Sequence, residues 1–169
     1  MSNKRVFFAL WPDHRQRDHL RDVINSVART VEGRAVDRRD WHVTLVFVGD
    51  LPEEQVPDLL ERARQIQFEP FHLVFDRLEF WARGRVAAMV AATIPVELQL
   101  LVDELNGIVQ DFGVIPNART YRPHITVARN ARTFTTERLA QRETTEWSSF
   151  ELVESIPAPG GVSYRPLKQ

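Results

Sequence analysis

The sequence predicts a mixed fold of strands and helices in which one strand–helix–strand unit occurs twice. The order of elements repeats with an offset of 82 residues, and each copy ends in a strand, at about 41–48 and 123–129, that contains His-x-Thr. The spacing agrees too, because 6–42 and 88–124 both span 36 positions. This agreement indicates an internal duplication with a pseudo-two-fold axis. We expect a single domain over 1–169, with no dividing linker.

Hydrophobic periodicity and end signals predict the individual elements. In the first unit, a strand over 5–10 leads to a helix that Asp13 caps, that runs to about Val31 and that Gly33 ends. In the second unit, Pro95 opens a helix over 96–112. The other expected elements are a helix over 51–66, one strand or two over 71–81, a hairpin at 83–84 into a strand over 85–93, a short helix over 135–142, and closing strands over 147–156 and 161–167.

The His-x-Thr motif places two polar side chains on one face of an apolar strand. Residues two apart on a strand share a face, roughly 7 Å from each other. His42 therefore lies on the face of Thr44, and His124 on the face of Thr126. The opposite face of the first strand is expected to be core, formed by Trp41, Val43, Leu45 and Phe47.

Composition excludes several kinds of chemistry. The 169 residues include no cysteine, which rules out disulfides, thiol nucleophiles and thiolate metal sites. No segment approaches the roughly 18 apolar residues of a membrane helix, and the apolar run near the N-terminus is too short for a signal peptide. We expect a soluble, cytoplasmic protein without a membrane partner. Its net charge of −1 argues against avid binding to long nucleic acid.

The remaining histidines do not suggest a metal site. His14 and His19 are five positions apart on a predicted helix, so they do not face one ion. His72 stands alone between apolar residues and is expected on a solvent-facing side of its strand. We expect neither a metal nor a cofactor.

Two histidines at one site can act as a general acid and a general base near neutral pH. Without cysteine, and without a serine in a Gly-x-Ser-x-Gly elbow, the expected nucleophile is water or a substrate hydroxyl. Threonine hydroxyls and nearby arginines would suit a phosphodiester, where charge grows on the non-bridging oxygens in the transition state. The alternative is structural, with each imidazole bonded to its neighbouring threonine in the core.

The paired motifs resemble those of a known superfamily. His42-Val43-Thr44-Leu45 and His124-Ile125-Thr126-Val127 are similar to the H-x-T-x motifs of the 2H phosphoesterases, and within them to the RNA 2′,3′-cyclic phosphodiesterases, also called 2′-5′ RNA ligases. The likeness extends over nearly the whole chain, including the segments 5–10, 47–50, 121–124 and 152–164. It implies an α+β, bilobal, LigT-like fold with two pseudo-symmetric lobes and antiparallel sheets around a central cleft.

The resemblance also implies a role for each motif residue. His42 would be the proton donor to the leaving 3′-oxygen, and His124 the proton acceptor that activates water, which leaves a 2′-phosphate. Thr44 and Thr126 would bind the phosphate.

Two arginines are further candidates for substrate binding. Arg122 shares the parity of His124 and so is expected on the same face. Arg129 has the opposite parity, and it reaches that face only if the strand ends or bulges at Ala128.

The expected activity is metal-independent hydrolysis of an RNA end that carries a 2′,3′-cyclic phosphate, for example on a tRNA fragment, by a monomer, with reverse 2′-5′ RNA ligase activity beside it. One alternative is a 2H phosphodiesterase that acts on small cyclic nucleotides or ADP-ribose cyclic phosphate. Others are a non-catalytic module that binds RNA ends and a purely structural protein.

Overall fold

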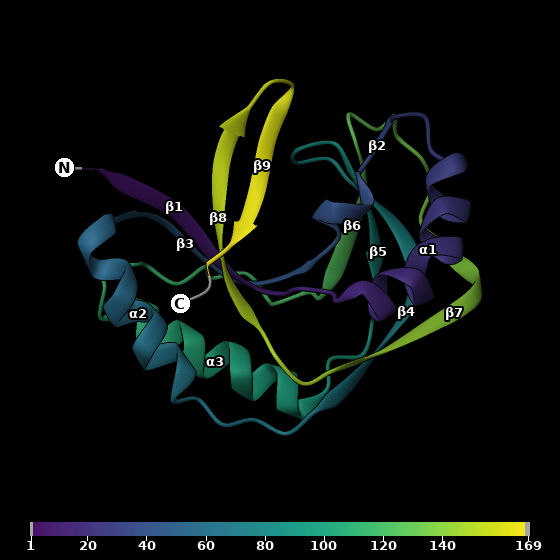
Figure 1. The fold of residues 1–169 in the computed structure, drawn as a ribbon. Coiled ribbons are helices and arrows are strands. Elements are labelled where there is room, and N and C mark those ends of the chain that lie inside the picture. Colours follow the sequence, from purple (N-terminus) through teal and green to yellow (C-terminus); the bar gives the residue numbers. More distant parts are fainter. Residues whose placement is uncertain (1, 168–169) are drawn as a thin grey trace.

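A computed structural model describes residues 2–167 and shows one large antiparallel sheet with three α-helices (Figure 1). The strands follow the order β7-β4-β5-β6-β3-β1-β8-β9, and the short β2 pairs with β6. This confirms the expected α+β class. The strands are β1 (Asn3–Leu10), β2 (Arg34–Ala35), β3 (Val43–Pro52), β4 (Phe71–Trp81), β5 (Val86–Val90), β6 (His124–Arg129), β7 (Glu137–Trp147), β8 (Glu151–Ala158) and β9 (Gly161–Pro166). The α-helices are α1 (His14–Arg29), α2 (Val56–Arg64) and α3 (Val96–Gln110), with short 3-10 turns η1 (Arg38–Asp40) and η2 (Glu53–Gln55).

The two halves of the sheet have the same local topology. The segments β1-α1-β3 and β5-α3-β6 each place a helix between two strands that pair with one another antiparallel. The halves meet where β3 pairs with β6, through the single register pair Val43 and Ile125. The two halves have the matching topology that an internal duplication would produce, and the duplication itself stays a prediction.

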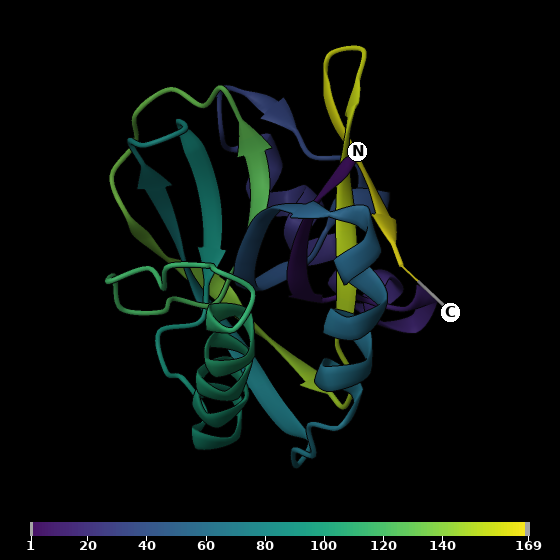
Figure 2. The ribbon, with the colours of Figure 1, turned by 90° about the vertical axis from the view of Figure 1, so that its left-hand side faces the viewer.

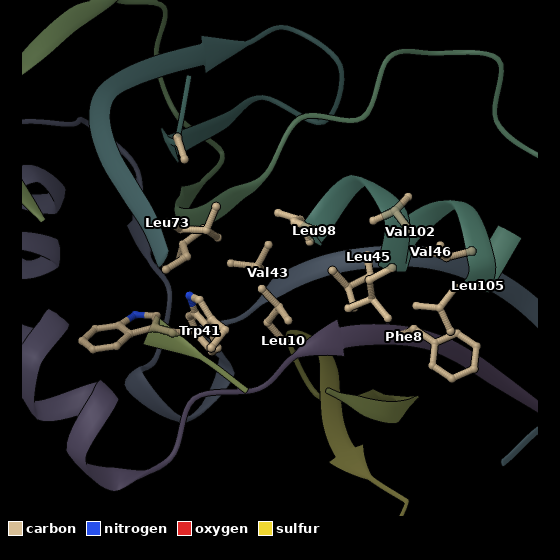
Figure 3. Packing of buried hydrophobic residues seen from close by; sticks show 14 of the residues in the cluster. Phe8, Leu10, Trp41, Val43, Leu45, Val46, Leu73, Leu98, Val102 and Leu105 are labelled. Atoms are coloured by element: carbon tan, nitrogen blue, oxygen red, sulfur yellow. The ribbon is translucent and has the colours of Figure 1, made fainter. Parts of the chain in front are cut away.

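The helices are exchanged between the two halves. Helix α1 packs against β6 and β7, whereas α3 packs against β3 and α2 (Figures 1 and 2). The core lies where α3 covers the strands of the first half, and there Leu98, Val102 and Leu105 face Val43 and Leu45 (Figure 3). The sequence places each helix after its own first strand, but its main strand partners belong to the other half.

Helix α1 begins as its sequence predicts. The Asp13 carboxylate accepts a hydrogen bond from the backbone N–H of Gln16, and the Gln16 side chain accepts one from the backbone N–H of Asp13. This reciprocal pair is a capping box, which satisfies two N–H groups that a helix start leaves free. Within residues 2–167, no helix has both the length and the apolar character needed to cross a membrane.

The expected helix over 135–142 is wrong, because residues 137–142 form the first part of strand β7 and residues 135–136 precede it. Its Glu, Arg, Gln and Ala residues favour a helix locally, yet β7 pairs with β4 from Phe71 to Leu78 and satisfies its backbone there. Thr145 and Trp147 are the buried side chains at its end. Trp147 therefore closes β7 rather than opening the next strand, and β8 begins at Glu151.

Two other boundaries also differ. Strand β3 continues to Pro52, so the helix expected over 51–66 is preceded by η2 and begins at Val56. Phe47, expected in the core, has 69% of its surface exposed. The reason is a bulge in β3, which also shapes the functional site.

Candidate active site

The two His-x-Thr motifs lie directly across from one another at the junction of the sheet. Val43 and Ile125, the middle residues of the two motifs, are register partners and fully buried. Antiparallel geometry then brings each histidine beside the threonine of the other motif. Because side chains alternate, both histidines and both threonines lie on the face opposite the buried pair. The structure therefore brings together four residues predicted from the sequence, namely His42, Thr44, His124 and Thr126.

His42 lies just before β3 in a largely aromatic environment. Its Nδ1–H donates to the carbonyl oxygen of Asp40 at 2.6 Å, which directs Nε2 away from that backbone. The Trp11 ring stacks on the imidazole at 5.4 Å between centroids, and Phe7 and Tyr164 lie 5.2 Å away. Burial among these rings lowers the pKa of His42 to about 4, because the charged imidazolium is poorly solvated there.

His124 begins β6 and is oriented in the same way. Its Nδ1–H donates to the carbonyl oxygen of Arg122 at 2.9 Å, and the Trp81 ring packs on it with centroids 4.2 Å apart. Burial lowers the pKa of His124, the nearby Arg122 charge lowers it further, and the Glu79 carboxylate opposes the shift. Each histidine thus keeps a proton on Nδ1, and its Nε2 is not used in this hydrogen bond to the backbone.

A tyrosine connects the two motifs across the junction. The Tyr121 hydroxyl donates to the carbonyl oxygen of Thr44 at 2.9 Å. Burial raises the pKa of Tyr121, so the phenol keeps its proton. The segment that precedes the second motif therefore holds the backbone of the first motif in place.

Matching bulges turn Arg129 and Phe47 onto the face of the histidines. On β6, Ala128 and Thr126 pair with consecutive residues of β5, so Val127 is an extra residue and the alternation shifts by one. On β3, Val46 and Thr44 pair with consecutive residues of β1 in the same way, with Leu45 as the extra residue. Arg129 thus reaches the site in the second half, and Phe47 occupies the equivalent position in the first.

The two candidate arginines have different surroundings. Arg122 forms a bidentate ion pair with the buried Glu79 carboxylate, at 2.8 and 2.6 Å, and its guanidinium lies over the Trp81 ring. Within the described residues, the Arg129 side chain forms one hydrogen bond, to the Tyr164 hydroxyl at 3.4 Å. Its charge lowers the pKa of both His42 and His124. Of these two arginines, Arg129 is therefore the one whose charge is available to a ligand. Arg122 is paired with Glu79 and packs on the Trp81 ring that contacts His124.

Several residues at the site did not emerge from the motif alone. Phe7 lies on β1, and Trp11 follows directly after this strand. Glu79 and Trp81 lie on β4. The His-x-Thr motif gives no signal for these four residues, because only the order of strands in the sheet brings them close to the histidines. Tyr164 belongs to a closing pattern in the sequence, but that pattern does not say where its side chain points.

Comparisons with known proteins point to one family. Residues 10–88 match the family model described as LigT like Phosphoesterase. The chain is 30% identical over 161 residues to the RNA 2′,3′-cyclic phosphodiesterase of Aeropyrum pernix, a match that covers 88% of this chain and 90% of that one. It is also 30% identical over 141 residues to the enzyme of the same name from Escherichia coli, covering 81% of this chain and 78% of that one.

A solved structure shares the whole fold. The crystal structure of E. coli LigT complexed with 3′-AMP superposes with a TM-score of 0.87 at 28% sequence identity, covering 99% of this chain and 97% of that one. The level of identity to the curated relatives, over most of both chains, is sufficient to assign the family. The chain belongs to the LigT-like family of the 2H phosphoesterases and is a hydrolase of phosphodiester bonds.

Proposed function

We propose that the protein is an RNA 2′,3′-cyclic phosphodiesterase that opens the cyclic phosphate to a 2′-phosphomonoester by two-histidine acid–base catalysis. The observation that carries this proposal is the register pair Val43 and Ile125, which sets the two His-x-Thr motifs across from one another on one face. Proteins of this name in A. pernix and E. coli are its relatives, which supports RNA as the substrate class.

The proposed reaction transfers the phosphoryl group to water in line. His124 accepts a proton through Nε2 from the attacking water as the new phosphorus–oxygen bond forms. The bond from phosphorus to the 3′-oxygen breaks, and His42 donates its Nε2 proton to that oxygen. The product keeps its phosphate on the 2′-oxygen. His124 then releases its proton to solvent and His42 takes one up, which resets both imidazoles. No step requires a metal or a cofactor.

The phosphate ligands are proposed from the same face. Thr44 and Thr126 each offer a hydroxyl donor beside the opposite histidine, and Arg129 adds a positive charge. Donors and charge fixed before the reaction stabilise the oxygens on which negative charge develops. A bound phosphate also favours a protonated imidazole, which supplies the acid form of His42.

The same site can use a 5′-hydroxyl in place of water. The hydroxyl would lose its proton to His124 and form a 2′-5′ phosphodiester, while the 3′-oxygen leaves with the proton of His42. We therefore propose 2′-5′ RNA ligase activity as a second outcome of one mechanism. We also expect the protein to act in the cytoplasm, as a monomer.

Histidine substitutions distinguish an enzyme from a module that only binds RNA ends. We expect His42→Ala and His124→Ala each to lower turnover of a cyclic-phosphate RNA by at least about a hundredfold, with normal circular dichroism. His72→Ala is the matched control, because this histidine is exposed on β4 away from the site. If the wild type binds the cyclic-phosphate RNA without turnover, and both variants lose this binding, the result would contradict catalysis and favour the binding module.

The length of the substrate separates the proposal from activity on small molecules. We expect a short RNA with a cyclic end to be hydrolysed with a higher kcat/KM than a 2′,3′-cyclic mononucleotide or ADP-ribose cyclic phosphate, because additional nucleotides provide contact area. An equal or higher kcat/KM for either small molecule would assign the site to small cyclic phosphates instead.

A further inference from the structure

Tyr164 lies on the C-terminal hairpin, the last element of the chain, and yet reaches the site. The hairpin is formed by β8 and β9, and β8 pairs with β1 of the first half (Figures 1 and 2). The phenol ring meets His42 edge-on, with centroids 5.2 Å apart and planes at 69°, and it packs similarly on Phe7. The ring therefore forms part of the aromatic surroundings of His42.

Two arginines, one on β2 and one on β6, form hydrogen bonds with this hairpin. Arg34 of β2 and Arg129 of β6 are register partners, so they lie side by side on neighbouring strands. Arg34 donates through Nη1 to the carbonyl oxygen of Gly160 at the hairpin turn, at 3.0 Å. Arg129 donates through Nη2 to the Tyr164 hydroxyl oxygen at 3.4 Å. Tyr164 is thus in contact with both halves, with His42 on one side and Arg129 on the other.

The direction of that hydrogen bond determines what the phenol can do. A guanidinium has only donors, so the Tyr164 oxygen must be the acceptor in its contact with Arg129. The phenolic proton then stays available, because the Tyr164 hydroxyl donates no hydrogen bond to another group within residues 2–167. A neighbouring cation polarises the hydroxyl and makes it a better donor. The group that would fit this donor is an anionic oxygen located between His42 and Arg129.

We propose that the Tyr164 hydroxyl donates a hydrogen bond to a non-bridging oxygen of the substrate phosphate, so that the C-terminal hairpin completes the phosphate site. This inference rests on the proposed function, because the cyclic phosphate is the anion concerned. Tyr164 is then a substrate-contacting residue, and it shares the phosphate with Arg129. The hairpin contributes to the site chemically, in addition to packing on His42.

Tyr164→Phe removes the hydroxyl and keeps the ring. We expect the variant to retain the thermal unfolding temperature of the wild type, while kcat/KM for a cyclic-phosphate RNA falls roughly tenfold to a hundredfold, the range for losing one hydrogen bond to a charged oxygen. The control is Ser163→Ala, because Ser163 is the exposed neighbour of Tyr164 on β9 and its side chain alternates to the other face of the strand. It should match the wild type.

Sulfur substitution in the substrate separates a direct contact from an effect on packing. Replacing one non-bridging oxygen with sulfur gives two diastereomers, and sulfur is a weak hydrogen-bond acceptor. Tyr164→Phe should lower kcat/KM for only one diastereomer, because in the other the contacted oxygen is already sulfur. An equal loss for both diastereomers, or no loss with the all-oxygen substrate, would overturn the proposal.

The same measurements separate this proposal from the proposed function. A wild-type protein that hydrolyses the cyclic phosphate while Tyr164→Phe is indistinguishable from it refutes only the phenol contact. A wild-type protein without turnover refutes the proposed function, and the role of Tyr164 with it.

Discussion

At the scale of single residues, the two histidines differ in what surrounds them. Aromatic rings enclose His42, whereas the charged pair of Glu79 and Arg122 stands behind His124. Burial lowers the pKa of both imidazoles, and of His42 to about 4. In the free protein the neutral form of both imidazoles is therefore favoured at pH 7, and a minority of molecules carries the proton that the proposed acid, His42, must donate.

This predicts the position of the pH optimum. The proposed mechanism needs one imidazole charged and the other neutral, and the population of such molecules is greatest midway between the two pKa values. Both values lie below the ordinary 6.5, so kcat/KM should follow a bell-shaped profile with its maximum below pH 6.5. Initial rates at low substrate concentration across pH 4 to 9 measure this. A maximum above pH 7, or a flat profile from pH 5 to 8, would contradict it.

The two arginines should respond differently to substitution. Arg129→Ala removes a charge that faces both histidines, so we expect kcat/KM to fall by at least about tenfold with little loss of stability. Arg122→Ala leaves the buried Glu79 carboxylate without its bidentate partner, which should lower the free energy of unfolding by about 2 kcal/mol. Urea unfolding and kinetics on both variants test the contrast. The reverse pattern would make Arg122 the phosphate ligand.

The positions of Arg129 and Phe47 show what the sequence of a single strand cannot predict. Strand parity places Arg122 on the site face, Arg129 behind it unless the strand ends or bulges at Ala128, and Phe47 in the core. Matching bulges at Leu45 and Val127 reverse the last two positions. A bulge depends on the register with a neighbouring strand, which a single strand's sequence does not contain.

At the scale of elements, the helices with a periodic apolar pattern could be predicted from the sequence, and the edge strand β7 could not. Helices α1 and α3 were expected because apolar residues recur along them at helical spacing, and the capping box at Asp13 marks the start of α1. Strand β7 was missed because it is an edge strand with little buried surface, so its charged residues resemble a solvated helix. Its pairing with β4 decides the conformation. That each helix packs on the other half's strands also depends on tertiary structure alone.

The junction between β2 and β6 can be tested through a glycine. A Cβ placed on Gly33 would lie 2.9 Å from the carbonyl oxygen of Arg129 and 3.0 Å from the Cα of Ala131, both backbone atoms. Gly33→Ala should therefore push the strands apart, lower the free energy of unfolding by roughly 1–3 kcal/mol and reduce activity by moving Arg129.

Gly107→Ala in α3 is the matched control for this prediction. Nothing lies within 4 Å of the added Cβ at that position. Because alanine favours a helix over glycine, this variant should be more stable than the wild type by up to about 1 kcal/mol, with unchanged activity. A Gly33→Ala protein as stable and active as the wild type would show that the strands accommodate the methyl group.

At the scale of the whole molecule, one sheet carries two similar halves, and β3 of the first half pairs with β6 of the second half at the two motifs. The net charge of −1 offers no general attraction for a polyanion. Recognition should therefore concentrate on the phosphate at the junction, where His42, His124 and Arg129 gather. This arrangement suits an enzyme that acts on the end of an RNA rather than along its length.

The most direct test of this account is phosphorus NMR of a short RNA with a 2′,3′-cyclic phosphate end, incubated with the protein in excess EDTA. We predict conversion of the cyclic phosphate signal to that of a 2′-monophosphate, and no conversion over the same time with His124→Ala. This result would establish the reaction, its regiochemistry and its independence of metal in one experiment. An unchanged cyclic phosphate, a 3′-monophosphate product, or full activity in His124→Ala would contradict the two-histidine mechanism.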